Sequence, residues 1–308
     1  MNLSRARSGN PLSTISTPAA ALVRTAAACL LGLAALNAAA EPAELRAKYT
    51  EVREQMRNNT LHRSLHIDSS ESQDALQGDV YAVLDHPFEK VSSALANPAQ
   101  WCDIMILPFN TKYCHAVQDG GSPGLLVRIG RKFDQPLHKA HRLRFSFRNL
   151  AAGPGYFESR LNAAEGPMGT RDYRMVLAAV PLDGGRTFIH LGYSYAAGMA
   201  GRIAMQSYLA TLGADKVGFT VTGRDTAGQP QYIAGVRGAV ERNAMRYYLA
   251  IDSYLDSLDV PAAQQVEKRI QGWFTATERY PRQLREMDRP TYVAMKRLEV
   301  VRQQALLQ

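Results

Sequence analysis

The sequence predicts an α+β protein in which an antiparallel sheet is followed by one long helix. Three observations favour this class. The stretch Gly78–Cys114 begins with a strand-like run, Val80–Leu84, and continues into two short amphipathic helical segments. Residues Arg142–Arg148 alternate apolar and polar side chains, as in a strand with one buried and one wet face. Apolar residues recur every three or four positions throughout Gln231–Leu258, which predicts a helix of about 42 Å.

Residues 1–40 predict a secretory signal peptide. Three arginines are the only charged side chains there, the apolar run Thr25–Leu36 comes next, and three alanines end at Ala40. This is the pattern of a leader that is cleaved near Ala40. A membrane anchor is the alternative, although the run is shorter than the roughly 20 apolar residues that a spanning helix needs. Cys29 suggests a lipoprotein with a lipid attached at this residue, but the residues before it match the usual lipoprotein motif poorly.

The net charge bears on whether the protein binds nucleic acid, and the cysteine content bears on whether it works in an oxidising compartment. Cleavage near Ala40 would remove three of the 36 basic residues and none of the 28 acidic ones, which leaves a mildly basic chain. This balance does not indicate nucleic acid, and we expect no nucleic-acid partner. Cys102 and Cys114 would remain, and an even pair in an exported protein predicts a disulfide. Two separately buried thiols are the alternative.

The remaining elements follow from periodicity and turn residues. Before the long helix, the predicted elements are an exposed helix at Ala43–Asn58, strands at Leu61–Ile67 and Leu76–Asp85, the two helical segments of Gly78–Cys114, strands at Leu125–Arg131, Arg142–Arg148 and Tyr156–Ala163, a hairpin of Thr170–Val180 with Thr187–Tyr195, a short helix at Met199–Leu212 and a last strand at Val217–Thr222. Pro261 ends the long helix. Ala262–Gln308 then predicts two further helices.

The run HPFEKV…NPAQWCDI within Gly78–Cys114, taken with this order of elements, resembles the START-like superfamily, also called SRPBCC or Bet v 1-like. The resemblance covers about residues 60–258 and implies a helix-grip fold, in which a curved antiparallel sheet wraps a long C-terminal helix. Together with the leader pattern of residues 1–40, the resemblance predicts an exported bacterial member with four segments. These are a signal peptide at 1–40, an N-terminal helical segment at 41–60, a helix-grip domain at 61–260 and a helical C-terminal extension at 261–308.

Aromatic and sulfur-containing side chains are the candidates for a ligand-binding lining. They come from the strands and the long helix: Phe145, Phe147, Tyr173, Met175, Phe188, Tyr195, Phe219, Met245 and Tyr248. Inward side chains of this kind suit an apolar pocket with a few polar groups. By pattern alone they fit a solid core better. The START-like resemblance, which implies a hydrophobic cavity between sheet and helix, makes the two alternatives equal.

Motifs for catalysis, phosphate binding or metal binding are lacking, so we expect no cofactor and no metal. His190 is a weak catalytic candidate, because an inward imidazole would be able to act as a base. A structural or surface histidine is the alternative. Within the long helix, the polar cluster at 241–246 predicts a solvated face, or pairs with strand-end charges such as Asp103 and Asp172. Gly235 and Gly238 weaken that helix, so close packing or a ligand should compensate.

Three functions are compatible with these observations. The first is a periplasmic or secreted carrier for a lipid or another hydrophobic small molecule, whose apolar surface a cavity would remove from water. The second is a cyclase- or hydrolase-like enzyme for a hydrophobic substrate, as in some START-like relatives. The third is an envelope interaction protein. Its extension, 261–308, holds nine Lys and Arg against five Asp and Glu and would meet an anionic membrane surface.

Overall fold

The computed structural model describes residues 41–72, 75–210 and 215–305. The described residues from Leu45 onward form one compact unit. The predicted signal peptide, 1–40, lies outside the described residues. Among the helices that the structure describes, none is long and apolar enough to cross a membrane.

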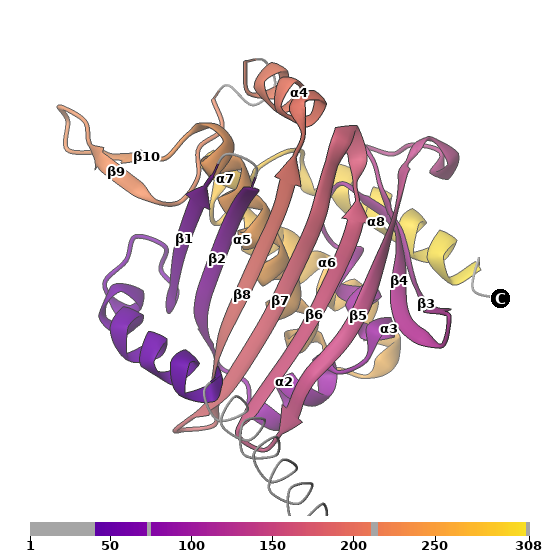
Figure 1. Ribbon diagram of the computed structural model, residues 1–308, viewed down its shortest axis with the longest axis horizontal. Coiled ribbons are helices and arrows are strands. Elements are labelled where there is room, and N and C mark those ends of the chain that lie inside the picture. Colours follow the sequence, from indigo (N-terminus) through magenta and orange to yellow (C-terminus); the bar gives the residue numbers. More distant parts are fainter. Residues whose placement is uncertain (1–40, 73–74, 211–214, 306–308) are drawn as a thin grey trace, which may run out of the picture. The chain divides into compact units, whose positions relative to one another are not determined.

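An eight-stranded antiparallel sheet forms the body of this unit (Figure 1). The strands lie in the order β1-β2-β8-β7-β6-β5-β4-β3. Their bounds are Leu65–Glu71 (β1), Ala75–Leu84 (β2), Thr111–Asp119 (β3), Ser122–Ile129 (β4), His141–Gly153 (β5), Tyr156–Glu165 (β6), Thr170–Leu182 (β7) and Arg186–Ala197 (β8). The predicted hairpin is confirmed as β7–β8, and the alternating run Arg142–Arg148 lies in β5.

Helices of different lengths surround the sheet and join its strands. Apart from the helix at residues 45–57, they are α2 (Phe88–Leu95), α3 (Pro98–Met105), η1 (Leu137–Lys139), η2 (Pro167–Gly169), α4 (Met199–Ala210), α5 (Gly235–Ser257), α6 (Ala262–Glu278), α7 (Pro281–Leu284) and α8 (Arg289–Ala305). Asn97 starts α3, because its side chain accepts a hydrogen bond from the Ala99 amide at 2.9 Å and Pro98 occupies the first turn.

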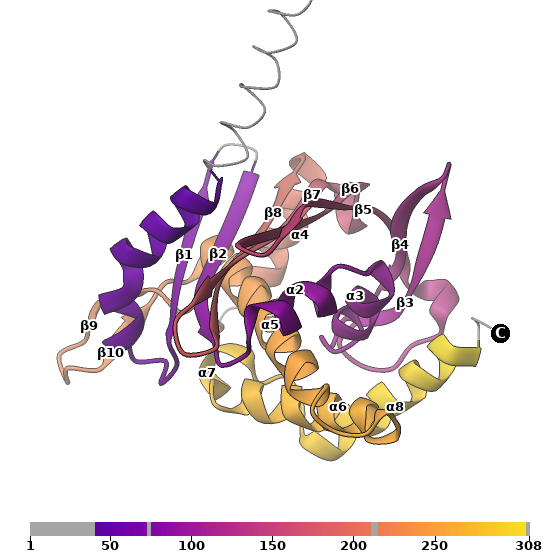
Figure 2. The ribbon, with the colours of Figure 1, turned by 90° about the horizontal axis from the view of Figure 1, so that it is seen from below.

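The sheet curves over α5, α2 and α3, with α6 and α8 on the far side of α5 (Figure 2). Burial extends around most of α5, and even Glu241 and Arg242 are buried. Two glycines allow this packing. A Cβ on Gly78 of β2 would lie 3.2 Å from the Val240 carbonyl oxygen, and one on Gly238 would lie 2.9 Å from the Ile233 carbonyl oxygen. Close packing therefore accounts for Gly238.

The prediction of a last strand at Val217–Thr222 is wrong for residues 217–220, and only 221–222 lie in a strand. The amides of Phe219 and Thr220 donate to the buried Glu241 carboxylate at 2.6 and 3.0 Å, so they are not available to a neighbouring strand. The chain instead forms a separate hairpin of β9 (Val221–Arg224) and β10 (Pro230–Tyr232). Because 230–232 pair as a strand, the long helix begins at Gly235 and not at Gln231.

The C-terminal helices are part of the main core. Trp273 of α6 and Tyr292 of α8 are fully buried, and both rings contact Phe109 at centroid distances of 4.9 and 5.3 Å. At least five of the nine basic side chains of this segment form ion pairs: Arg269, Arg285, Lys296, Arg297 and Arg302. Much of its positive charge is therefore compensated within the protein.

A fully buried charge triad joins α8 to β3. Glu299 accepts hydrogen bonds from Lys112 at 2.8 Å and from Lys296 at 2.7 Å, and all three side chains are inaccessible to solvent. Lys296 also donates to the carbonyl oxygens of Pro108 and Thr111. Burial lowers the pKa of Lys296 to about 8, although the Glu299 charge acts in the opposite direction. These bonds fix α8 to the start of β3.

Replacing Glu299 with Gln should lower the free energy of unfolding by about 3–5 kcal/mol, because it leaves two buried ammonium groups without their counter-charge. Urea denaturation measures this loss. Glu267→Gln is the matched control, since Glu267 pairs with Arg297 at 2.7 Å at an exposed site and its loss should have a much smaller effect. Equal losses in the two variants would contradict the role given to the triad.

Cys102 and Cys114 form a disulfide between α3 and β3, with Cα atoms 5.1 Å apart. Both residues are buried, and the bridge closes a short loop, with a sequence separation of 12. The bridge therefore holds the second short helix of the opening stretch against the edge strand that follows it.

Reduction of this disulfide should lower the free energy of unfolding by about 2–4 kcal/mol, because the unfolded chain regains the freedom that loop closure removes. Denaturation with and without reductant tests this. A variant with both Cys102→Ser and Cys114→Ser should no longer respond to reductant. Unchanged stability of the native protein on reduction would refute the prediction.

Candidate functional site

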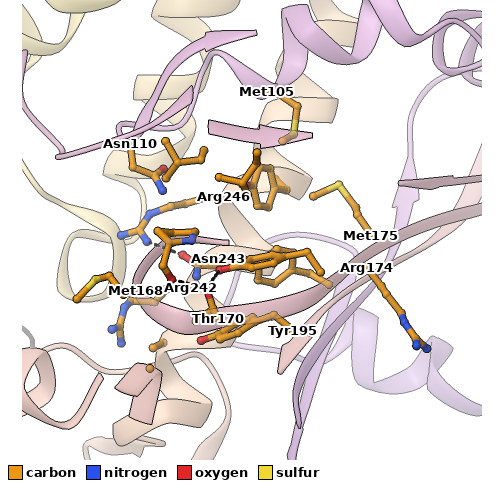
Figure 3. Close-up of a pocket in the computed structure, with 18 of the residues that line it drawn as sticks. Met105, Asn110, Met168, Thr170, Arg174, Met175, Tyr195, Arg242, Asn243 and Arg246 are labelled. Atoms are coloured by element: carbon orange, nitrogen blue, oxygen red, sulfur yellow. Dashed lines mark hydrogen bonds between the residues drawn. The ribbon is translucent and has the colours of Figure 1, made fainter. Parts of the chain in front are cut away.

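A cavity of about 340 Å³ lies between the sheet and α5 (Figure 3). Its walls come from β5, β7, β8 and α5, and α3, α4, η2 and the loop after β4 border it. The lining is formed by Met105, Asn110, Ile129, Lys132, Leu143, Phe145, Pro167, Met168, Thr170, Tyr173, Arg174, Met175, Tyr193, Tyr195, Gly201, Met205, Ala239, Arg242, Asn243, Arg246 and Tyr247. The cavity is thus partly apolar and partly basic.

Four tyrosines, which we call the tyrosine wall, line one side: Tyr173, Tyr193, Tyr195 and Tyr247. The rings of Tyr173 and Tyr195 stack at 5.3 Å, and Tyr193 lies 5.4 Å from Tyr247. A Cβ on Gly166 would meet the Tyr173 ring at 2.2 Å, so only glycine leaves room for that ring. Burial raises the pKa of all four phenols, which keeps them protonated.

Three of the four basic side chains of the lining gather at one end of the cavity, whereas Arg174 lies on another side (Figure 3). Lys132, Arg242 and Arg246 line it with Asn243, and we call these four residues the basic end. Figure 3 shows Asn110, Arg242, Asn243 and Arg246 on one side of the cavity, whereas Met105 and Met175 lie on the other. Arg242 and Arg246 are one turn apart on α5, so their side chains share a face of the helix.

Glu286 organises the basic end from the loop between α7 and α8. It accepts from Arg246 at 2.6 Å and pairs with Lys132 at 2.7 Å, while Lys216 lies 4.0 Å away. Burial opposes the charged form of Glu286, but the charges of Arg246, Lys132 and Lys216 outweigh it and hold the pKa of Glu286 below its usual value. The carboxylate therefore stays ionised and orients two cavity cations.

The border near η2 has unusual backbone geometry. Met168 has φ of 59° and Asp172 has φ of 54°, both left-handed conformations that side chains other than glycine rarely adopt. The β7–β8 register shifts between Arg171 and Arg174, which marks a bulge. Met168 is 62% exposed while it also borders the cavity. The mouth of the cavity therefore lies beside η2 and α4.

Four of the nine predicted lining residues contribute to the cavity: Phe145, Tyr173, Met175 and Tyr195. Another four lie in the buried core away from it: Phe147, Phe219, Met245 and Tyr248. Phe219, for example, packs edge-on against Tyr280 at 5.4 Å. Tyr248 accepts a hydrogen bond from Arg63 at 3.3 Å.

The prediction that Phe188 lines the cavity is wrong. Phe188 lies on the opposite face of the sheet, where it packs with Val180 under Leu45, Val52 and Met56 of the helix at 45–57. The reason is strand geometry. Positions 188 and 195 differ by an odd number on a strand without an irregularity against β2, so their side chains point to opposite faces.

His190 shares the outer face with Phe188, which removes it as a catalytic candidate for the cavity. Its ring stacks on Tyr81 at 4.6 Å, and its Nε2 atom lies 2.7 Å from Asp79 Oδ1. The histidine is therefore held by structural contacts between β8 and β2. The described residues that line the cavity include no histidine, aspartate or glutamate.

The basic end was missed at the sequence level, because the polar cluster 241–246 was expected to be solvated or to pair with Asp103 or Asp172. Instead Arg246 pairs with Glu286, and Asp103 pairs with Arg269 of α6. The partner comes from the extension, which the sequence does not place. Tyr193 was detectable, since it shares a strand face with Tyr195.

One histidine–carboxylate group stands apart from the cavity. Ligand atoms of His86, Asp252 and Asp256 lie within 4.8 Å of one another. Asp252 pairs with Arg63 at 2.5 Å, and Asp256 lies 3.1 Å from the Nε2 atom of His86. Each carboxylate of the group therefore has a side-chain partner within the protein.

The tyrosine wall predicts a loss of stability at high pH. Unfolded tyrosines ionise near pH 10, whereas the buried phenols stay protonated, so the unfolded state gains stability as the pH rises above about 10. Urea denaturation at several pH values should show the free energy of unfolding falling there. Phenolate absorbance of the native protein is the check, because full titration of every tyrosine near pH 10 in the folded state would contradict the prediction.

Comparison with known proteins adds no functional assignment. No family model matches the chain, and no curated protein matches it. One similar solved structure is Ara h 8.0201, with 10% identity, 63% of this chain and 99% of that chain covered, and a TM-score of 0.35. Truncated norcoclaurine synthase from Thalictrum flavum has 12% identity, covers 47% of this chain and 91% of its own, and has a TM-score of 0.32. Human StAR-related lipid transfer protein 5 has 10% identity, covers 56% of this chain and 90% of its own, and has a TM-score of 0.30. Scores this low support no inference about ligand or activity.

The fold assignment rests on the topology of the chain itself. A strand leads into two short helices, antiparallel strands follow, and a long helix crosses the inner face of the curved sheet (Figures 1 and 2). This order confirms the predicted α+β class, and the chain has the helix-grip arrangement of a curved antiparallel sheet wrapped around a long helix.

Proposed function

We propose that the protein binds a hydrophobic small molecule or a single-chain lipid in the cavity between the sheet and α5 and carries it. The observation that supports this proposal is the cavity of about 340 Å³ with its apolar and aromatic walls. Ligand sites commonly measure about 300–1,000 Å³ and have mostly apolar linings with a few polar groups. The volume lies at the low end of that range, which favours one chain or ring system over a lipid with two chains.

The apolar part of the cavity would accommodate the ligand's hydrocarbon. Met105, Leu143, Phe145 and Met175 line it and are almost completely buried. Each Å² of apolar ligand surface transferred from water to such walls contributes about 25 cal/mol. Thioether side chains adapt to ligands of different shape, so the methionines suit a binding site that tolerates several related ligands.

Export is part of the proposal. The leader-like pattern of residues 1–40 supports it, and so does the disulfide between Cys102 and Cys114, a bond that persists mainly in oxidising compartments. A carrier in the periplasm or outside the cell would shield an apolar ligand from water between two membranes or two proteins.

Binding is favoured over catalysis by the composition of the lining. His190 is on the outer face, and acid–base chemistry at the described walls would depend on tyrosine, lysine or arginine. Buried tyrosines with raised pKa are poor bases near neutral pH. The same walls need no change to bind an apolar ligand.

Met175→Trp should weaken binding of a fluorescent apolar probe by at least about tenfold, because the larger ring occupies cavity volume. Val176→Trp is the matched control, since the adjacent residue borders the hollow on the outer face and its substitution should leave binding unchanged. Fluorescence titration measures both. Solvent extraction of the purified protein gives a second test: no bound apolar molecule, together with no probe binding, would refute the proposed function.

A further inference from the structure

We propose that the cavity recognises an oxyanion, either a carboxylate or a phosphate, at the head of its apolar ligand, and that Lys132, Arg242 and Arg246 hold it. This inference rests on the proposed function and specifies the chemical class of the ligand. It adds a polar anchor to a site that apolar contacts alone would leave unselective. The ligand would then be an anionic amphiphile with a single chain or ring system.

The charge of the lining carries the first step. Three basic side chains border the cavity at its basic end, whereas no carboxylate is among the described residues of the lining. Arg242 is 2% exposed and Arg246 is 8% exposed. Glu286 compensates Arg246 from outside the lining, and Arg242 donates to the Val217 carbonyl oxygen at 3.2 Å. Guanidinium groups match carboxylate and phosphate oxygens with paired donors. An anionic head group is the ligand chemistry that this end favours.

Arg246 provides the second, independent observation. Its terminal nitrogens donate to Asn243 at 3.2 Å and to Glu286 at 2.6 Å. Its buried Nε has no hydrogen-bond partner among the described residues. A buried donor without an acceptor is uncommon in folded proteins and costs free energy. An oxyanion beside this guanidinium, after a small shift of the side chain, would supply the missing acceptor.

Glu286 positions the donors of the basic end before a ligand binds. It holds Arg246 and Lys132 in place from the C-terminal extension, which is itself fixed by the Lys112–Glu299–Lys296 triad. Glu286 does not satisfy every donor of Arg246, because the Nε atom has no partner among the described residues. Positioned donors lose little conformational entropy when an anion binds, which favours affinity.

The position of the basic end fits an amphiphile. Lys132 has a side chain that is 35% exposed, and the exposed Met168 borders the same cavity, so the basic end lies toward solvent. Met105 and Met175 lie on the opposite side and are buried (Figure 3). A ligand would therefore place its charged head near the mouth and its hydrocarbon inside.

Calorimetric titration of the full chain with four probes tests this inference: dodecanoate, dodecyl phosphate, dodecanol and inorganic phosphate. We expect at least one anionic amphiphile to bind about tenfold or more tightly than dodecanol, because charge-assisted hydrogen bonds add to the shared apolar contacts. Comparing the carboxylate with the phosphate identifies which head group is preferred. Inorganic phosphate, which lacks the tail, should bind far more weakly than either.

Two variants assign the effect to the basic end. Arg246→Gln should weaken binding of the preferred anionic amphiphile by about tenfold to a hundredfold and leave the binding of dodecanol nearly unchanged. Lys132→Gln acts at a partly exposed site, so it should fold even if the first variant does not, and it should reduce the same preference. Arg269→Gln is the control, because Arg269 is equally buried and pairs with Asp103 outside the cavity. It should bind all probes like the native protein.

The outcomes separate this inference from the proposed function. Equal binding of dodecanol and both anions would overturn the oxyanion site and leave the apolar cavity in place. If inorganic phosphate binds as tightly as dodecyl phosphate, the inference that the ligand is an amphiphile is overturned. Loss of anion preference in Arg269→Gln to the same degree as in Arg246→Gln would also overturn the assignment. No binding by any of the four probes would refute both proposals.

Discussion

The burial of α5 under the curved sheet is the constraint on which the rest of the structure depends. The helix is covered on most sides, and Gly78 and Gly238 bring neighbouring backbone into close contact with it. The polar side chains that this burial covers need partners inside the protein. Glu241 binds the backbone at 219–220, and Arg246 binds Glu286. The polar part of the cavity is therefore a consequence of how the helix is buried.

The C-terminal extension completes this arrangement. Trp273 donates a hydrogen bond to the Arg246 carbonyl oxygen at 3.1 Å, and the loop after α7 supplies Glu286. The extension is itself joined to β3 through the buried triad, a costly set of charges that is satisfied only when all its members are in place. The same segment thus stabilises the core and orients the cations of the cavity, although its charge alone suggested a membrane-facing role.

The alternation of residues along the strands predicted part of the candidate site. Phe145, Tyr173, Met175 and Tyr195 line the cavity because each is on the inner face of its strand. Phe188 was assigned to the inside with Tyr195, and His190 was a weak candidate on the condition that it faced inward. A period of two places 188 and 190 on the other face. This error was avoidable, since the register of β8 against β2 is regular. The basic end was less accessible, because a polar cluster in a helix usually faces water.

The sequence by itself determined the order of elements, the α+β class and the long apolar helix, because hydrophobic periodicity and turn residues are local properties of the chain. Only the tertiary structure decided which face of the sheet encloses the cavity. It also decided that residues 217–220 bind Glu241 of α5 and do not form a strand, and that Arg246 pairs with Glu286, 40 positions later in the chain. These features depend on contacts between distant segments. The strand order, with β8 between β2 and β7, brings such segments together, and no local pattern specifies it.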